Sequence, residues 1–216
     1  MIICSHELPE YKKTYGGTQR MNGAYWYSVE IVENIIPRVK TWRPWVTINV
    51  RGKCADHAIV FIHNNLNPHL YDWLSEYDDL VLICGVPSTC EKVAHLGRTV
   101  YLPLSIDTKY VSSFGGVRKD IDRAFAGRGG KKCGHHFSLG TRTLANMDRE
   151  MLLRNLARCK AVYAVGRCAL EAKCLGAEIL PYDERFPDPS IWKVIDNYDA
   201  AKLLQLELDK IDKETK

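Results

Sequence analysis

The chain has 216 residues, of which 46% are hydrophobic and 26% charged, and its formal net charge is +4. These values are typical of a folded globular protein, so the composition excludes an intrinsically disordered chain. The small positive charge permits binding to phosphate groups, but it excludes the strongly basic character of histone-like proteins.

The sequence indicates a cytoplasmic protein. It has no run of about 18 apolar residues that could span a membrane, and its first ten residues lack the basic start and apolar core of a signal peptide. Its eight cysteines contain no Cys-x-x-Cys pair and are expected to be reduced thiols. Cys133, His135 and His136 come closest to a metal cluster. Adjacent histidines in a loop rarely bind one ion together, so we expect no metal site.

Short β-branched runs alternate with helical periods along the chain, which predicts parallel sheets covered by helices. The helix expected over 23–39 carries Tyr25, Val29, Val32 and Ile36 on one face. The other elements expected in the first half are strands at 1–4, 45–50, 58–65, 79–86 and 99–106, a short helix at 69–77, and a helix at 88–96 capped by Ser88.

Small flexible residues at 112–116 predict a linker, after which the α/β pattern restarts. The second half is expected to hold a helix or the approach to a strand at 117–125, helices at 147–159 and 167–176, and strands at 160–165 and 177–182. Asp188 and Pro189 fit the N-cap and first position of a final helix. The buried face of that helix would carry Ile195, Tyr198, Ala201, Leu204, Leu208 and Ile211.

We therefore expect an α/β protein of two small Rossmann-like domains, each with a parallel sheet, that face a cleft. The first domain would comprise residues 1–112 and the second residues 117–189, and a C-terminal helix over 190–212 would pack across the domains. A cleft between two such domains is the usual location of a ligand site.

Two glycine-bearing segments have the composition of anion-binding loops. Gly16 and Gly17 lie between the first expected strand and helix, where glycines let backbone N–H groups approach an anion. Arg128, Lys131 and Lys132 lie between glycines, and Arg and Lys form strong bonds to phosphate oxygens. The alternatives are a plain tight turn for the first segment and a solvated basic loop for the second.

A third segment places Gly166 between an expected strand and an expected helix, with Glu171 about one turn inside. A helix N-terminus after a strand favours an anion, and a carboxylate at this depth can accept hydrogen bonds from a ribose. Glu171 could instead be a surface salt-bridge partner, which is the commoner role of a helical Glu.

In this arrangement the sequence resembles glycosyltransferases of the GT-B fold, in particular the retaining family 4-like enzymes that use nucleotide-diphosphate sugars. The resemblance covers residues 1–182 and follows the chain order of five segments: GGTQR, VFIHNN, DDLVLICGVPSTCEKVAHLG with TVYLPLSIDTKYV, AFAGRGGKKCG, and LARCKAVYAVGRCALEAKCLGAEIL.

The resemblance implies a role for each matching residue. Arg128 and Lys132 would hold the donor diphosphate, Glu171 the ribose, Gly16 and Gly17 would abut the phosphate, His63 would lie near the transferred sugar, and Gly166 and Arg167 would complete the donor site. His63, Arg128 and Lys132 would thus be the catalytic residues of a metal-independent and retaining transfer. The nucleotide-diphosphate sugar would be a substrate, and no cofactor is implied.

Two other classes of protein remain open. Tyr163 stands where the family usually has a second Glu, which favours a non-catalytic nucleotide or nucleotide-sugar binding protein with the same shell. The segment KTWRPW offers a cation and aromatic rings, which would suit a nucleic-acid-binding protein. The acceptor of a transferase could be a glycan, a lipid, a protein or modified DNA. Five Trp and eleven Tyr residues would also suit a homo-oligomer.

Overall fold

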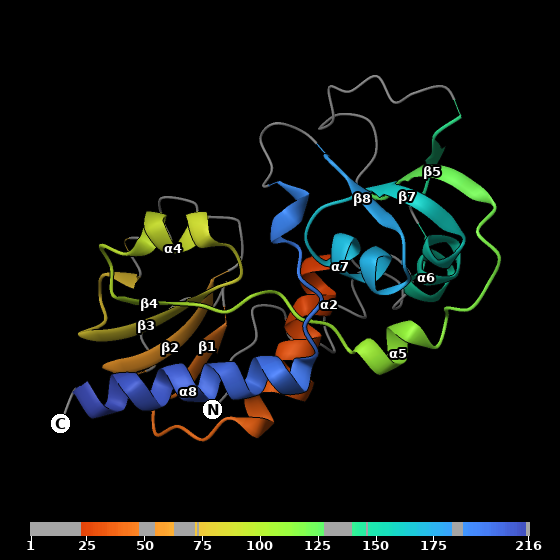
Figure 1. The fold of residues 1–216 in the computed structure, drawn as a ribbon. Coiled ribbons are helices and arrows are strands. Elements are labelled where there is room, and N and C mark those ends of the chain that lie inside the picture. Colours follow the sequence, from red (N-terminus) through yellow and green to blue (C-terminus); the bar gives the residue numbers. More distant parts are fainter. Residues whose placement is uncertain are drawn as a thin grey trace. The chain divides into compact units, whose positions relative to one another are not determined.

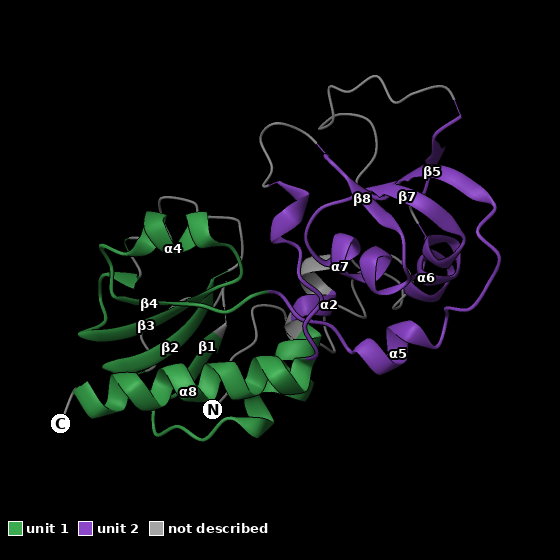
Figure 2. Ribbon diagram, in the orientation of Figure 1, with its two compact units in different colours: residues 1–14, 28–103, 197–216 green, residues 15–27, 104–196 purple. Residues whose placement is uncertain are grey.

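The structure, a computed structural model, describes residues 23–47, 55–62, 72, 74–127, 140–145, 147–182 and 188–214. The chain folds into two compact units (Figure 2). Unit 1 comprises the described residues of 28–103 and 197–214, and unit 2 comprises those of 23–27 and 104–196. Each unit contains a parallel sheet, which confirms the expected Rossmann-like α/β class. Within the described ranges, no helix is both long and apolar enough to cross a membrane.

Unit 1 is built on a four-stranded parallel sheet in the order β1-β2-β3-β4 (Figure 1). The strands are β1 (Trp45–Thr47), β2 (His57–Ile62), β3 (Asp79–Cys84) and β4 (Arg98–Tyr101). The two central strands, β2 and β3, are buried at every position after the first. This burial is why their sequences are continuous apolar runs rather than alternating ones. Helix α4 (Pro87–Val93) joins β3 to β4.

A helical run precedes β1 and changes type along its length. It begins as α2 (Gly23–Glu30), continues as the π-helical segment η2 (Ile31–Ile35) and ends as the 3-10 turn η3 (Ile36–Arg38). Pro37 has no N–H to donate to the preceding turn, so the α-type ladder cannot continue through it. The sequence predicted a helix over this span, and the structure confirms it with an irregular second half.

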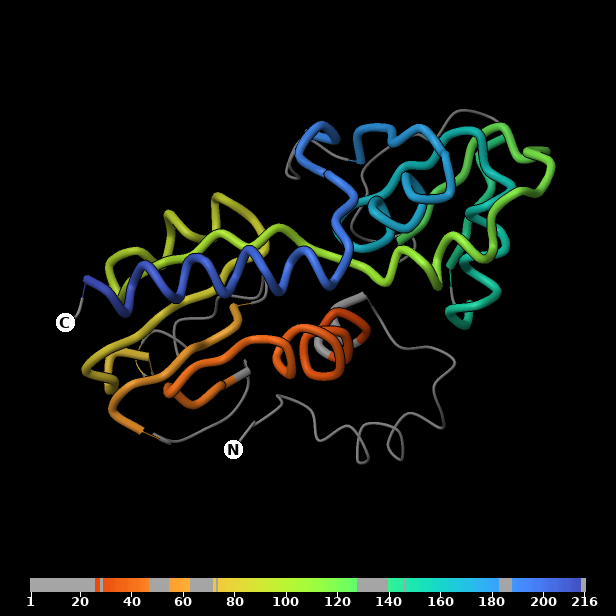
Figure 3. The backbone as a smooth tube through the Cα atoms, turned by 60° about the horizontal axis from the view of Figure 1, so that its bottom comes forward, coloured from red at the N-terminus to blue at the C-terminus, as the bar shows by residue number. Residues whose placement is uncertain are grey.

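The C-terminal helix α8 (Asn197–Glu214) belongs to unit 1 and contacts η2 and η3 (Figure 3). Its Gln205 side chain accepts a hydrogen bond from the Lys40 N–H at 2.7 Å and donates one to the Lys40 carbonyl at 3.1 Å. At its start, the buried Asn197 amide donates to the Glu30 carboxylate at 2.5 Å. Residues distant in sequence therefore hold this helix both at its start and near its middle.

Unit 2 contains a second four-stranded parallel sheet, in the order β6-β5-β7-β8. Its strands are β5 (Ile121–Phe125), β6 (Arg142–Thr143), β7 (Cys159–Tyr163) and β8 (Glu178–Leu180). Its helices are α5 (Thr108–Ser112), α6 (Arg149–Ala157), α7 (Arg167–Cys174) and the 3-10 turn η4 (Pro189–Ile191). The segment 117–125, expected as a helix or the approach to a strand, is therefore the approach to β5.

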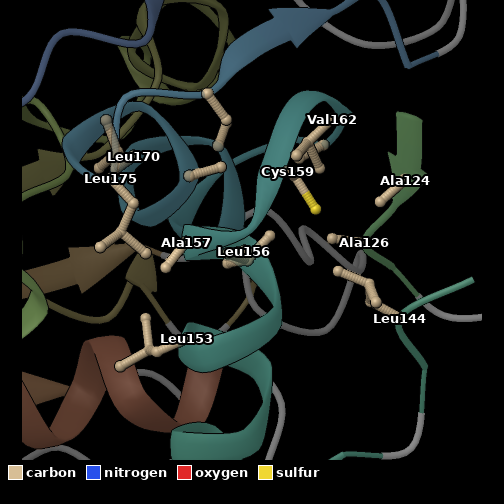
Figure 4. Packing of buried hydrophobic residues seen from close by; sticks show 14 of the residues in the cluster. Ala124, Ala126, Leu144, Leu153, Leu156, Ala157, Cys159, Val162, Leu170 and Leu175 are labelled. Carbon is tan, nitrogen blue, oxygen red and sulfur yellow. The ribbon is translucent and has the colours of Figure 1, made fainter. Parts of the chain in front are cut away.

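The core of unit 2 lies between its helices and its sheet (Figure 4). Leu153 and Leu156 of α6 and Leu170 of α7 are fully buried against β7, whose Cys159 and Val162 are fully buried as well. Burying a side chain of this size contributes about 1.5–3 kcal/mol. Packing thus fixes α6 and α7, and with them the start of each helix.

Within the described residues the chain passes between the units at Tyr27–Ser28, Pro103–Leu104 and Asp196–Asn197, whereas the sequence suggested a linker at 112–116. Those residues lie inside unit 2, because Phe114 packs on its core and meets the Tyr110 ring edge-on at 5.3 Å. The final helix, α8, begins at Asn197 rather than at 190, and it is part of unit 1.

Two expected helix starts are wrong. Ser88 does not cap α4, which begins with Pro87 after the extended Val86. Asp188 and Pro189 do form an N-cap and first position, but of the short turn η4.

The chain between η4 and α8 pairs with another segment instead of continuing as a helix. Ile106 donates its N–H to the Ile195 carbonyl at 3.1 Å, and the Thr108 hydroxyl donates to Asp196 at 2.6 Å. The apolar face expected for the final helix is wrong at its first two residues, because Ile195 precedes α8 and Tyr198 is exposed. The strand expected at 1–4 lies outside the described residues, as do residues 69–71 and 73 of the helix expected at 69–77.

Candidate functional site

The carboxyl edge of the unit 2 sheet has the topology of a ligand site. The chain leaves β5 toward β6 on one side, and it leaves β7 toward β8 on the other side, while β5 and β7 are neighbours. In open parallel sheets, ligands bind at such a switch point, outside the carboxyl ends of the two strands. Within unit 2 this edge is therefore the expected location of a ligand site.

Two of the three glycine-bearing segments begin at this switch point. Phe125, the last residue of β5, pairs with Tyr163, the last residue of β7. The next residue, Ala126, donates its N–H to the Tyr163 carbonyl at 3.0 Å. The chain therefore leaves β5 at Ala126 beside the segment that leads into α7.

Gly166 forms the turn from β7 into α7. Its φ of 59° and ψ of −135° lie in a region that residues with a side chain avoid, so the sharp turn requires glycine. As the N-cap it offers no side-chain acceptor to the helix. The first N–H groups of a helix have no partner within the helix, and their partial positive charge favours an anion.

Glu171 is buried one turn inside α7 and faces two arginines. Its Oε1 accepts a hydrogen bond from Arg167 Nε at 2.7 Å and lies 3.5 Å from Arg149 Nη2. The side chains of Glu171 and Arg167 are only 3% and 5% exposed. Glu171 is therefore a salt-bridge partner, as the alternative had it, but in the interior rather than on the surface.

Arg149 is the first residue of α6 and brings two aromatic rings to this cluster. Its guanidinium carbon lies 4.8 Å from the centre of the Trp26 ring and 5.0 Å from the centre of the Tyr110 ring. Such cation–π contacts hold the guanidinium plane against the rings. Side chains from α2, α5, α6 and α7 thus converge at the starts of α6 and α7.

The end of β5 is closely packed against the segment that follows β8. A Cβ atom on Gly127 would lie 2.6 Å from the Tyr182 hydroxyl oxygen and 3.0 Å from Phe125 Cζ. The Phe125 and Tyr182 rings are themselves 5.2 Å apart. Only glycine fits here without movement of its neighbours, so the chain leaves β5 along a fixed path.

Cys168, at the second position of α7, is not poised as a nucleophile. Burial raises the pKa of its thiol to about 12, and the nearby Glu171 carboxylate acts in the same direction. A thiol with such a pKa stays protonated near neutral pH and reacts slowly.

The Asp-x-Asp pair, Asp120 and Asp122, lies at the opposite, amino edge of the sheet. A bidentate contact from Arg158 lowers the pKa of the Asp120 carboxyl, and a hydrogen bond from Lys160 lowers that of Asp122. Both carboxyls are exposed. The two carboxyls therefore belong to a solvated charged face, and their partners come from β7 and its approach.

The other expected site residues lie outside the described residues: Gly16, Gly17, His63, Arg128 and Lys132, as well as Cys133, His135 and His136. Among the residues that are described, no group of three or more His, Cys, Asp or Glu side chains is placed to hold a metal ion.

Sequence reasoning missed Arg149, Trp26 and Tyr110. No spacing rule connects residues so far apart in the chain, and only the packing of four helices brings them together. The single local signal is Arg167 with Glu171, a pair at the i, i+4 spacing of helical ion pairs.

The described residues define a protein with two Rossmann-like parallel α/β units, of which the second has a candidate anion site at its switch point. Comparison with known protein families, with curated proteins and with solved structures found no match to this chain.

Proposed function

We propose that the protein is a glycosyltransferase whose unit 2 binds the diphosphate of a nucleotide sugar at the carboxyl edge of its sheet. The observation that carries this proposal is the adjacency of β5 and β7 at the switch point. It brings the start of the basic glycine-bearing segment beside the glycine-initiated helix α7. A diphosphate suits both features, since it combines several oxygens with a high negative charge.

In the proposed reaction the anomeric C–O bond of the donor breaks while negative charge grows on the departing diphosphate. Arg128 and Lys132 would stabilise that charge together with the N-terminus of α7, which is an electrostatic and positioning role. His63 would lie near the transferred sugar. Retention of configuration follows only from the resemblance to the GT-B enzymes, and the acceptor could be a glycan, a lipid, a protein or modified DNA.

A non-catalytic nucleotide-binding protein is the second candidate. Tyr163 replaces the family's second Glu, and it lies half-buried at the end of β7, at the switch point itself. A protein that had lost transferase activity but still bound a nucleotide would keep the diphosphate site and could replace the second Glu with Tyr163.

The third candidate, a nucleic-acid-binding protein, finds less support. Arg43 of the segment KTWRPW is buried, with Nη1 2.7 Å from Asp79 Oδ2 and Nε 3.7 Å from Asp212 Oδ1. Of the aromatic rings in that segment, Trp42 is exposed but Trp45 is buried against Phe61. The Arg43 guanidinium therefore serves unit 1 instead of meeting a phosphate backbone.

A thermal-shift screen separates these candidates. Purified protein is heated with UDP, GDP, ADP and their common sugar conjugates, with and without EDTA. A ligand at 100 times its dissociation constant adds about 2.7 kcal/mol of stability. We expect an EDTA-insensitive shift with one diphosphate, followed by slow release of sugar from its conjugate. A shift without any sugar release would favour the non-catalytic protein, and salt-sensitive retention on DNA alone would favour the third candidate.

A further inference from the structure

We propose that Glu171 is a positioning residue, held by Arg167 and Arg149, and that the site recognises the phosphate groups of its ligand without using Glu171 to bind the ribose. This inference rests on the proposed function. It departs from the role that the GT-B resemblance implies for Glu171.

The Glu171 carboxylate is buried. The side chain is 3% exposed, and its Oε1 lies 2.7 Å from Arg167 Nε and 3.5 Å from Arg149 Nη2. To accept hydrogen bonds from both hydroxyls of a ribose diol, the carboxylate would have to turn Oε1 away from two guanidinium groups in the interior. Breaking a buried ion pair costs more than a hydrogen bond to a charged group returns. Oε1 is therefore committed to Arg167 and Arg149.

Two arginines hold the carboxylate in place. Arg167 reaches it from the same helix, at i, i+4 spacing, and Arg149 reaches it from the start of α6. Arg149 is 13% exposed and lies against the Trp26 and Tyr110 rings. A planar guanidinium stacked on aromatic rings has few other orientations, so Arg149 braces Glu171 from outside α7.

This brace acts at the start of α7. Arg167 directly follows Gly166 and is the first residue of α7, so fixing its side chain fixes the turn at the mouth of the helix. Charges in the interior are screened less than charges in water. Arg149 and Arg167 therefore contribute positive potential near the α7 start without touching the ligand. Phosphate groups respond to that potential, and a neutral ribose does not.

The test compares three ligands by calorimetric titration: a nucleoside diphosphate, its 2′,3′-dideoxy analogue and inorganic pyrophosphate. The base is the one that the thermal-shift screen selects. We expect the intact protein to bind the first two within about twofold of each other, because the ribose hydroxyls meet no carboxylate. Glu171→Gln should change the affinity for all three ligands by one common factor.

A second pair of variants tests the brace. Arg149→Gln should weaken binding of all three ligands by about fivefold, through loss of positive potential and of the brace. Arg154→Gln is the matched control, because Arg154 lies on the same helix but is exposed and pairs with the exposed Glu150. It should change each affinity by less than about twofold. Arg149→Lys keeps the charge without the planar stack, and circular dichroism verifies that each variant is folded.

Two results would overturn the inference. If the dideoxy analogue binds more than about tenfold more weakly than the diphosphate, and Glu171→Gln removes that difference, then Glu171 binds the ribose and only the proposed function survives. If neither the nucleoside diphosphates nor pyrophosphate bind the intact protein, the proposed function fails, and the inference fails with it. A loss on Arg154→Gln equal to that on Arg149→Gln would show a general charge effect and would overturn the role of Arg149.

Discussion

The Lys119 side chain joins three backbone carbonyls, a role that its neighbours in the sequence do not predict. Its Nζ donates hydrogen bonds to the Cys159 carbonyl at 2.8 Å, the Leu175 carbonyl at 3.0 Å and the Ala157 carbonyl at 3.4 Å. Ala157 ends α6 and Leu175 is the C-cap of α7. A positive charge at a helix C-terminus is favourable, and here one ammonium serves two helices.

We therefore expect Lys119→Met to lower the free energy of unfolding by about 1.5–3 kcal/mol, the range for hydrogen bonds to a charged group. Methionine keeps the apolar stem and removes the donors. Urea denaturation followed by circular dichroism measures the loss. Lys109→Met, at an exposed position of α5, is the control and should change stability by less than about 0.5 kcal/mol. Equal losses in the two variants would contradict the role of Lys119.

Gly127→Ala should destabilise the protein by about 1–3 kcal/mol, as overpacking of a filled site does. The new Cβ would lie 2.6 Å from the Tyr182 hydroxyl oxygen. Tyr182→Phe removes that atom, so the double variant should lose less than the sum of the two single losses. Urea denaturation of the four proteins gives the coupling energy. Additive losses would mean that the hydroxyl does not limit the space at Gly127.

At the scale of elements, α8 is fastened to the unit 1 sheet by ion pairs around Arg43. This buried guanidinium contacts Asp79 at the start of β3 and Asp212 on α8, and His57 Nδ1 lies 3.2 Å from the same Asp79 oxygen. Burial alone would raise the pKa of Asp79, but its contacts with Arg43 and His57 outweigh burial and hold that pKa below its ordinary value.

This shift gives a pH dependence with a definite sign. Because the folded-state pKa of Asp79 is below the ordinary value of 3.8, its contribution to stability is present above that pH and is lost as the pH falls below it. Asp79→Asn should flatten the decline in unfolding free energy on the acid side. Urea denaturation between pH 5 and pH 2, a range that extends well below the ordinary pKa of 3.8, measures the slope. Asp199→Asn, at an exposed position of α8, should leave the slope unchanged, and an unchanged slope in Asp79→Asn would contradict the account.

The sequence predicted the interiors of elements better than their ends. The apolar runs of β2 and β3 were recognisable because every position after the first is buried in each strand. Helix α7 was predicted through Gly176, whose φ of 76° suits the residue after a helix C-cap. The start of α8 was missed because the bonds from Ile106 and Thr108 to Ile195 and Asp196 are tertiary, and no local pattern contains them.

At the scale of the whole molecule, two parallel α/β units could be predicted, but the strand order and the division between the units could not. Strand order arises from crossovers that leave no mark in any one segment, and the order β6-β5-β7-β8 is what creates the switch point. Gly166, Arg167 and Glu171 could be predicted as site residues because they lie in one local segment of the sequence. The contacts of Arg149 with Trp26, Tyr110 and Glu171 could not be predicted, because only the packing of the helices brings these residues together.

The central claim is that unit 2 binds a diphosphate at this switch point. Its most direct test is a calorimetric titration of the intact protein and of Arg128→Ala with UDP, GDP and ADP. The account predicts that one of these ligands binds the intact protein and that Arg128→Ala loses about 1.5–3 kcal/mol of binding free energy while remaining folded. Absence of binding by all three ligands, or equal affinities of the two proteins for the ligand that binds, would contradict it.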